Sequence, residues 1–212
     1  MNTSDYIVNK FNINLSDRRI DGYIVIPGMR RVHLAELFSE LGFKTGAEIG
    51  VLSGKYSEIL CRSNPKAKIY SIDSWKSYPE FPDFFEKNKL SDSYNYAVKL
   101  LSKYKNSEII KKTSMEAVHG FPDASLDFVY IDANHTFEYV LEDITEWAKK
   151  VRKGGIVAGH DFEEHIVKKA FGDVKVALDL YMRRANLDYV FIVGKRMSRD
   201  RDHNLSWFFV KQ

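Results

Sequence analysis

Four acidic residues lie where the strands of this 212-residue sequence are predicted to end. Glu48, Asp73, Asp132 and Asp161 each come at, or just after, the end of a short apolar run, which is the pattern of a buried strand. In α/β sheets, ligands bind outside the carboxyl ends of the strands. Carboxylates at that edge can hold a cationic group, a hydroxyl group or a divalent metal ion. The sequence therefore predicts a polar ligand site at the strand ends.

Gly50 and Gly54 follow the first of these runs and indicate a turn between a strand and a helix. Glycine takes backbone angles that side chains forbid, and it lets a ligand lie against the main chain. The dinucleotide fingerprint G-x-G-x-x-G would require glycine at positions 48 and 53, but these hold Glu48 and Ser53. A carboxylate there repels a pyrophosphate and attracts an ammonium or sulfonium group. The turn thus predicts a cationic nucleoside rather than NAD, and Asp73, 23 residues after Gly50, is placed to bond its ribose.

Strands and helices alternate along the chain and must position these residues. Strands are predicted at 45–50, 68–73, 107–111, 126–132 and 155–159, with helices between them. The last two strands, 189–193 and 206–210, are joined by a basic loop too short for a crossover helix, so this pair should be antiparallel. The predicted fold is α/β and Rossmann-like: a seven-stranded sheet, mostly parallel with a C-terminal antiparallel hairpin, and helices on both faces. If the crossover connections are right-handed, the strand order of the sheet reverses between the first and fourth strands.

One domain, 1–212, is expected from the length, with a cap and helix at 1–43 and a cofactor-binding core at 44–212. The segment 75–85 is rich in aromatic residues and holds two prolines, which disfavour a regular helix. It is interpreted either as a lid or substrate wall beside the cleft, or as an apolar patch covered by a second subunit in a homodimer.

The composition sets the expected surroundings of the protein. Lys and Arg number 32 against 29 Asp and Glu, and the net charge of +3 does not indicate binding to nucleic acid or to a membrane. Cys61 is the single cysteine, which excludes an internal disulfide and favours a reducing compartment. The sequence shows no secretory leader pattern and no apolar run of about 18 residues. A cytoplasmic protein without membrane or nucleic-acid partners is expected.

The chain resembles the class I S-adenosylmethionine-dependent methyltransferases over roughly 45–212. The segment 48–54, EIGVLSG, resembles their first motif, 71–73, SID, resembles the acidic second motif, and the terminal hairpin is a feature of the family. The segments 127–137, DFVYIDANHTF, and 154–162, GGIVAGHDF, are similar to the small-molecule O-methyltransferase branch that includes the catechol and macrocin enzymes. The resemblance implies S-adenosylmethionine as the methyl donor and a hydroxyl of a small molecule, a sugar or a phenol, as the acceptor.

The resemblance also assigns residues to the donor. Glu48 would hold the amino group of its methionine part, Asp73 would hold the ribose, and the glycine turn would carry the ligand. Ser114 and Met115 would flank the adenine, with Met115 as an apolar platform. Plain core packing is the alternative for Met115.

Asp132 and Asp161 are expected to hold a divalent ion such as Mg²⁺, because acids at these strand ends do so in the metal-dependent relatives. His160 stands where some relatives have a second acid, and an imidazole ligand would shift the preference toward Mn²⁺, Fe²⁺ or Zn²⁺. The alternative is a metal-free site in which Asp132 closes a turn or polarises the acceptor.

His135 and His160 are the candidate general bases, because an unperturbed histidine titrates near neutral pH. Each has an alternative interpretation as a strand-end or helix-cap residue. Two other functions stay open: an RNA ribose methyltransferase, and a catalytically silent fold retained for binding. Methylation of a base amino group is disfavoured, because the fourth strand ends in Asp132-Ala-Asn-His135 and not in an Asn/Asp-Pro-Pro-aromatic motif.

Overall fold

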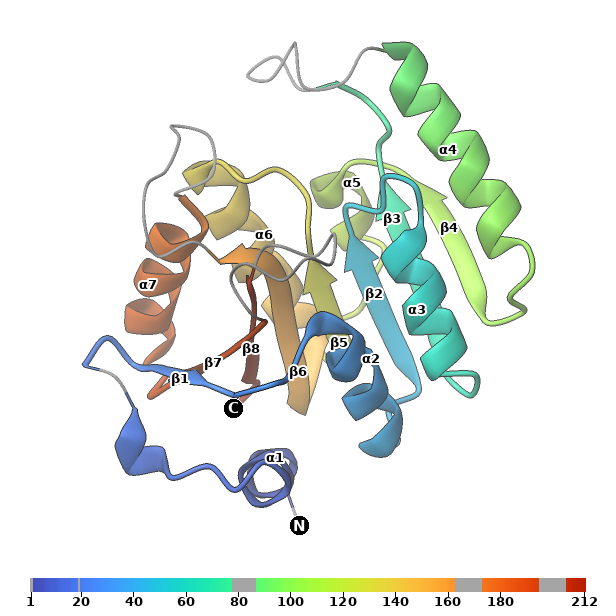
Figure 1. Ribbon diagram of the computed structural model, residues 1–212. Helices are drawn as coiled ribbons and strands as arrows, with labels where there is room; N and C mark the ends of the chain where they lie inside the picture. The colour runs from blue at the N-terminus through green and yellow to red at the C-terminus, as the bar shows by residue number, and fades with distance from the viewer. Residues whose placement is uncertain (1, 19, 78–86, 163–172, 195–204) are drawn as a thin grey trace.

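The computed structural model describes residues 2–18, 20–77, 87–162, 173–194 and 205–212 of the chain. Within these ranges, eight strands form one sheet in the order β1-β7-β8-β6-β5-β2-β3-β4. β2 lies between β3 and β5 and is parallel to both. The chain therefore adds strands on one side of β2 and then on the other, so the strand order reverses where the crossover rule predicts (Figure 1). The strands are β1 Tyr23–Val25, β2 Thr45–Ile49, β3 Lys68–Asp73, β4 Ser107–Lys111, β5 Leu126–Ile131, β6 Val151–Phe162, β7 Val190–Val193 and β8 Leu205–Val210.

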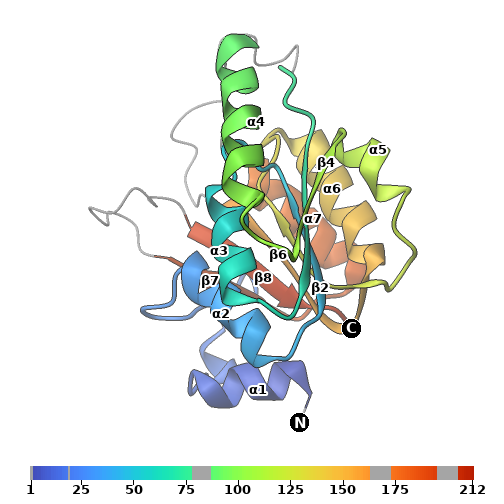
Figure 2. The same cartoon turned by 90° about the vertical axis from the view of Figure 1, so that its right-hand side faces the viewer.

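Helices cover both faces of the sheet (Figure 2). Val129 and Trp147 belong to the core between the sheet and α5, α6 and α7, whereas Phe38 and Phe128 belong to the core against α1, α2 and α3. Successive residues of a strand point to opposite faces, so β5 contributes to both cores and, apart from Asp127, carries apolar and aromatic residues along its length. None of the helices in the described ranges is long and apolar enough to cross a membrane. The helices are α1 Thr3–Lys10, α2 Arg31–Glu40, α3 Lys55–Ser63, α4 Lys87–Leu101, α5 Ser114–Val118, α6 Phe137–Lys150 and α7 Asp173–Ala185, with a 3₁₀ turn at Leu15–Asp17.

The predicted fold class is confirmed, and the hairpin β7–β8 is antiparallel as expected. The sheet has one strand more than the seven predicted, because Tyr23–Val25 pairs in parallel with β7 instead of belonging to a cap. A strand of three residues is too short to show a period of two. Residues 78–85 of the expected lid lie outside the described residues.

β6 extends beyond the predicted strand 155–159 and carries two site residues near its end. Between Gly159 and Phe162, its register against β8 slips by one residue. Asp161, inside the slip, has a φ of +54°, an uncommon value for a residue with a side chain. Such a bulge bends a strand and re-aims a side chain, and bulges of this kind occur next to active sites. The bulge therefore decides where His160 and Asp161 point.

Gly50 lies where β2 passes closest to the end of β5. A Cβ atom at Gly50 would be 2.1 Å from the carbonyl oxygen of Asp132, and its φ is +90°. The Asp132 N–H donates a hydrogen bond to the Ile49 carbonyl, with an N···O distance of 2.7 Å. Only glycine fits this turn, for reasons of both space and backbone angle.

Substituting Gly50→Ala should lower the free energy of unfolding by about 3 kcal/mol, the sum of a left-handed alanine and an overpacked contact. Gly42→Ala is the matched control, since Gly42 has a φ of +71° but nothing within 4 Å of the position that a Cβ atom would take. We expect the control to cost only about 1 kcal/mol in urea denaturation. Equal losses in the two variants would show that the contact with Asp132 does not constrain the turn.

Candidate active site

The glycine turn is fastened to the end of β3 by the carboxylate of Asp73. Its Oδ2 accepts hydrogen bonds from the N–H groups of Val51 and Leu52, each at 2.9 Å, and its Oδ1 accepts one from Trp75 N–H at 2.7 Å. The Trp75 indole donates to the Leu52 carbonyl at 2.7 Å and closes the arrangement. Asp73 thus shapes the turn itself, and its predicted contact with a ribose stays a prediction.

Glu48 is buried on the α3 face of β2, with 2% of its surface exposed. Its carboxyl accepts a hydrogen bond from the Ser57 hydroxyl, and the Ser71 hydroxyl donates to that of Ser57 at 2.9 Å. Burial raises the pKa of Glu48 to about 8, with the Ser57 hydrogen bond opposing this shift. Neutral pH therefore leaves this acid mostly protonated until a cation comes near.

Ser114 and Met115, the predicted adenine neighbours, lie in the short helix α5. The Ser114 hydroxyl donates to the carboxyl of Asp143 and accepts from the Trp147 indole at 2.8 Å. Met115 is half-buried against the core on the α6 face. The Ser114 side chain thus ties α5 to α6, while contact of either residue with adenine stays a prediction.

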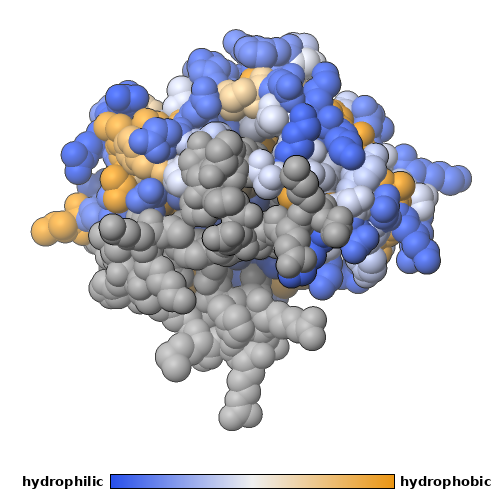
Figure 3. Space-filling model, turned by 90° about the horizontal axis from the view of Figure 1, so that it is seen from above, coloured by the Kyte–Doolittle hydropathy of each residue, from blue (hydrophilic) through white to orange (hydrophobic). Residues whose placement is uncertain are grey.

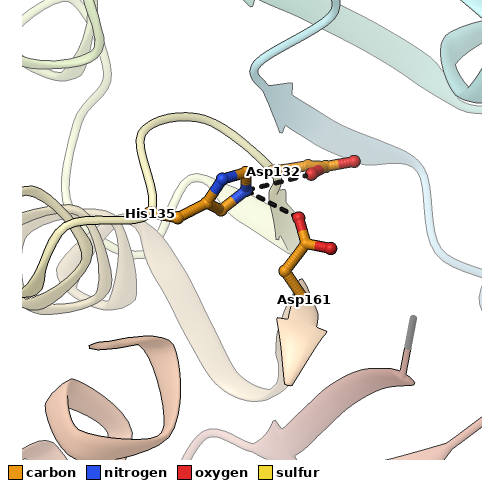
Figure 4. Close-up of side chains that lie close together, drawn as sticks. All are labelled: Asp132, His135 and Asp161. Carbon is orange, nitrogen blue, oxygen red and sulfur yellow. Dashed lines mark ion pairs between the residues drawn. The ribbon is translucent and has the colours of Figure 1, made fainter. Parts of the chain in front are cut away.

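Asp132, His135 and Asp161 come together at the ends of β5 and β6 (Figure 4). The imidazole of His135 points toward both carboxylates, with its Nε2 2.7 Å from Asp161 Oδ2 and 3.6 Å from Asp132 Oδ1. One ligand atom from each of the three residues lies within 4.8 Å of the others. We call these three residues the acid–histidine cluster.

His160 stands beside the cluster. Its Nδ1 is 3.2 Å from Asp161 Oδ1 and 3.8 Å from Asp132 Oδ1. The sequence predicted His160 as a metal ligand beside the two acids, and both His135 and His160 as candidate bases. The structure instead brings His135 into the compact group of three and leaves His160 next to it.

The proton of His135 is held firmly in this arrangement. Burial opposes its charged form, but hydrogen bonds to Asp132 and Asp161 outweigh burial and raise the pKa of His135 to about 10. Burial likewise opposes the charge on Asp161, yet hydrogen bonds from His135 and His160 lower the pKa of that carboxyl below its usual range. The pair is therefore an imidazolium and a carboxylate at neutral pH.

Arg31, at the start of α2, is a site residue that the sequence did not single out. Its Nη1 is 3.7 Å from Asp132 Oδ2, and its guanidinium lies over the Tyr56 ring, 5.1 Å from the centroid. The Tyr56 hydroxyl donates to the Arg31 carbonyl at 3.0 Å. In the sequence, Arg31 is half of one of several basic pairs at helix ends, which the local pattern assigns to solvent.

The face at the carboxyl ends of the strands is seen from above in Figure 3. Much of the surface that the described residues form there is hydrophilic, with apolar residues gathered mainly toward one side.

The fold and this site define a class I methyltransferase. Residues 47–162, more than half of the chain, match the family described as "Methyltransferase domain", so the chain belongs to that family. The match includes the glycine turn, Asp73, the acid–histidine cluster and His160. The resemblance to S-adenosylmethionine-dependent enzymes predicted from the motifs is thereby confirmed.

Solved structures share the fold at low sequence identity. The O-methyltransferase TomG from Streptomyces achromogenes, in complex with SAM, is 16% identical, with a TM-score of 0.62 over 99% of this chain and 89% of that one. The Bacillus cereus O-methyltransferase in complex with SAH is 14% identical, with a TM-score of 0.60 over 99% and 90%. N-methyltransferase NodS from Bradyrhizobium japonicum WM9 is 13% identical, with a TM-score of 0.55 over 85% and 94%. The fold therefore accommodates different acceptor atoms.

A curated relative, the uncharacterized protein y4gI of Sinorhizobium fredii, is 21% identical over 177 residues. The match covers 83% of this chain but only 18% of that much longer protein. The chain thus corresponds to a small part of its relative.

Asp143 should make the stability of the protein depend on pH. Burial raises its pKa to about 7, with the Ser114 hydrogen bond opposing the shift. Between about pH 4 and pH 7, the unfolded chain loses this proton while the folded protein keeps it, so stability falls as pH rises through that window. In Asp143→Asn, which cannot ionise, stability relative to the parent protein should improve by about 3 kcal/mol from pH 4.5 to pH 8.

Chemical denaturation at the two pH values measures this difference. Glu138→Gln removes a carboxylate from an exposed position in the first turn of α6 and serves as the control. If Asp143→Asn differs from the parent protein by the same free energy at both pH values, the buried acid does not keep its proton on folding.

Proposed function

We propose that this protein transfers the methyl group of S-adenosylmethionine to a hydroxyl of a small molecule, a sugar or a phenol, with the help of a divalent metal ion. The observation that carries the proposal is the acid–histidine cluster directly beside the glycine turn, where Gly50 abuts the main chain of Asp132. The SAM and SAH complexes of similarly folded O-methyltransferases support the choice of donor and of oxygen as the acceptor atom.

The cluster fits a divalent cation in its donor atoms. Two carboxylates and one imidazole offer ligand atoms within 4.8 Å of one another, and water can fill further positions. The imidazole nitrogen favours Mn²⁺, Fe²⁺ or Zn²⁺ over Mg²⁺. Such an ion, when bound, would draw the acceptor hydroxyl to the cluster and lower the pKa of that hydroxyl.

The protein's own residues divide the remaining tasks. The glycine turn and Asp73 provide the seat for the nucleoside, and Glu48 offers a buried acid for the ammonium group. The methyl group of a sulfonium is already activated, so the principal contribution is to align donor and acceptor in line. The contact between Gly50 and Asp132 places the two seats next to each other.

Removal of the acceptor proton falls to His160 in this arrangement. The proton on His135 is held at neutral pH by Asp132 and Asp161, and its Nε2 faces those carboxylates. As an imidazolium or as a metal ligand, His135 has no lone pair to take a proton from the acceptor. His160, next to Asp161, keeps the role of candidate base, and Asp161 would stabilise its charged form.

Substituting Asp161→Asn should reduce methyl transfer by about 100-fold or more, because it weakens the metal site and removes the partner of both histidines. The affinity for S-adenosylhomocysteine should change less than about threefold, since the main chain that Gly50 of the glycine turn abuts is that of Asp132 and Ala133. Turnover is measured as S-adenosylhomocysteine formed with a panel of sugar and phenol acceptors, and affinity by calorimetry. Asp92→Asn, in an exposed position on α4, is the control for removing one carboxylate.

Metal dependence is tested with the same acceptor panel. The protein stripped with a chelator should lose turnover, and Mn²⁺ or Mg²⁺ should restore it. Full turnover of the stripped protein would overturn the metal's part of the proposal. Tighter binding of NAD than of S-adenosylmethionine would overturn the choice of donor.

A further inference from the structure

We propose that Arg31 binds the carboxylate of the methionine part of the methyl donor. This inference rests on the proposed function and extends it to a positioning residue that the sequence motifs do not contain. S-adenosylmethionine carries an ammonium and a carboxylate on one carbon atom. Its binding site therefore requires an acidic side chain for the ammonium group and a basic side chain for the carboxylate, close together.

The position of the Arg31 side chain meets this requirement. Its Nη1 is 3.7 Å from Asp132 Oδ2, and the carbonyl oxygen of the same aspartate lies 2.1 Å from where a Cβ of Gly50 would stand. The guanidinium and the glycine turn thus both lie next to Asp132: the guanidinium next to its carboxylate, and the turn next to its main chain. The charge of Arg31 also acts on Glu48, where it favours the carboxylate form that an ammonium group needs.

The guanidinium is held in place by the helix that the glycine turn begins. Tyr56 lies in the first turn of α3, its ring lies 5.1 Å from the guanidinium carbon, and its hydroxyl bonds the Arg31 carbonyl at 3.0 Å. About a quarter (25%) of the Arg31 side chain is still exposed to solvent. Arg31 is therefore positioned relative to the donor seat before any ligand binds, yet a ligand can reach it.

The charges of the site favour such a cation. Asp73, Asp132 and Asp161 line the strand ends, and a carboxylate entering among them would meet repulsion. Arginine can bind a carboxylate through two parallel hydrogen bonds. The Nη1 of Arg31 is 3.7 Å from Asp132 Oδ2, which is longer than the distance of about 2.7–2.9 Å in such a bond.

The test is a pair of ligands that differ only in the carboxylate: S-adenosylmethionine and decarboxylated S-adenosylmethionine. Arg31→Gln should weaken binding of the first by about 10- to 100-fold, the range for a hydrogen bond between charged groups. It should change binding of the second by less than about threefold. Arg31→Lys, which keeps the charge but not the planar fork, should give an intermediate loss for the first ligand only. Calorimetry at one ionic strength gives all of these constants.

Arg62→Gln is the matched control, because it removes the same charge from an exposed position in the last turn of α3. It should leave the preference between the two ligands unchanged. Equal losses for both ligands in Arg31→Gln and Arg31→Lys would overturn the inference and leave Arg31 as a structural partner of Asp132. Unchanged binding of both ligands by Arg31→Gln, together with a raised KM for an acidic acceptor, would also overturn the inference. That result would indicate that Arg31 binds the acceptor instead of the donor. If the parent protein binds neither ligand, the proposed function fails as well.

Discussion

The close contact between the glycine turn and the main chain of Asp132 sets the geometry of the site. Backbone approaches backbone so closely there that no side chain fits at Gly50. The contact exists because the strand order reverses beside β2. This reversal makes β2 and β5 neighbours in the sheet although they are distant in sequence. The proposed nucleoside site and the acid–histidine cluster then lie about one strand spacing apart, about 4.8 Å. In the proposed function, this proximity brings the methyl donor and the acceptor into contact.

Charge is the second constraint on the site. Acids at the ends of neighbouring strands repel one another, and each is accommodated differently. Glu48 stays protonated through burial, Asp161 is paired with the His135 imidazolium, and Asp132 faces Arg31. The site is thereby suited to ligands that bring positive charge, such as a sulfonium, an ammonium or a divalent cation. Its cationic side chains, Arg31 and His135, suit an anionic group such as the carboxylate of the proposed methyl donor.

Much of the fold was predictable because its signals are local. The apolar runs of β3, β4 and β5 and the acids near their ends can be recognised in the sequence, and so can the missing third glycine of the turn. The three-residue β1 was missed because it is too short to show a period. The bulge at Asp161 depends on the pairing of β6 with β8, and the role of Arg31 depends on Tyr56 and Asp132. No local pattern contains those contacts.

The most direct measurement is a crystal structure of the protein grown with S-adenosylhomocysteine and Mn²⁺, with anomalous data collected at the manganese edge. We expect the nucleoside against Gly50 and Asp73, and an anomalous peak among Asp132, His135 and Asp161 at the usual ligand distances of about 2.1–2.3 Å. A nucleoside bound away from the glycine turn would contradict the donor seat. A nucleoside in place with no manganese among those three residues would contradict the metal site.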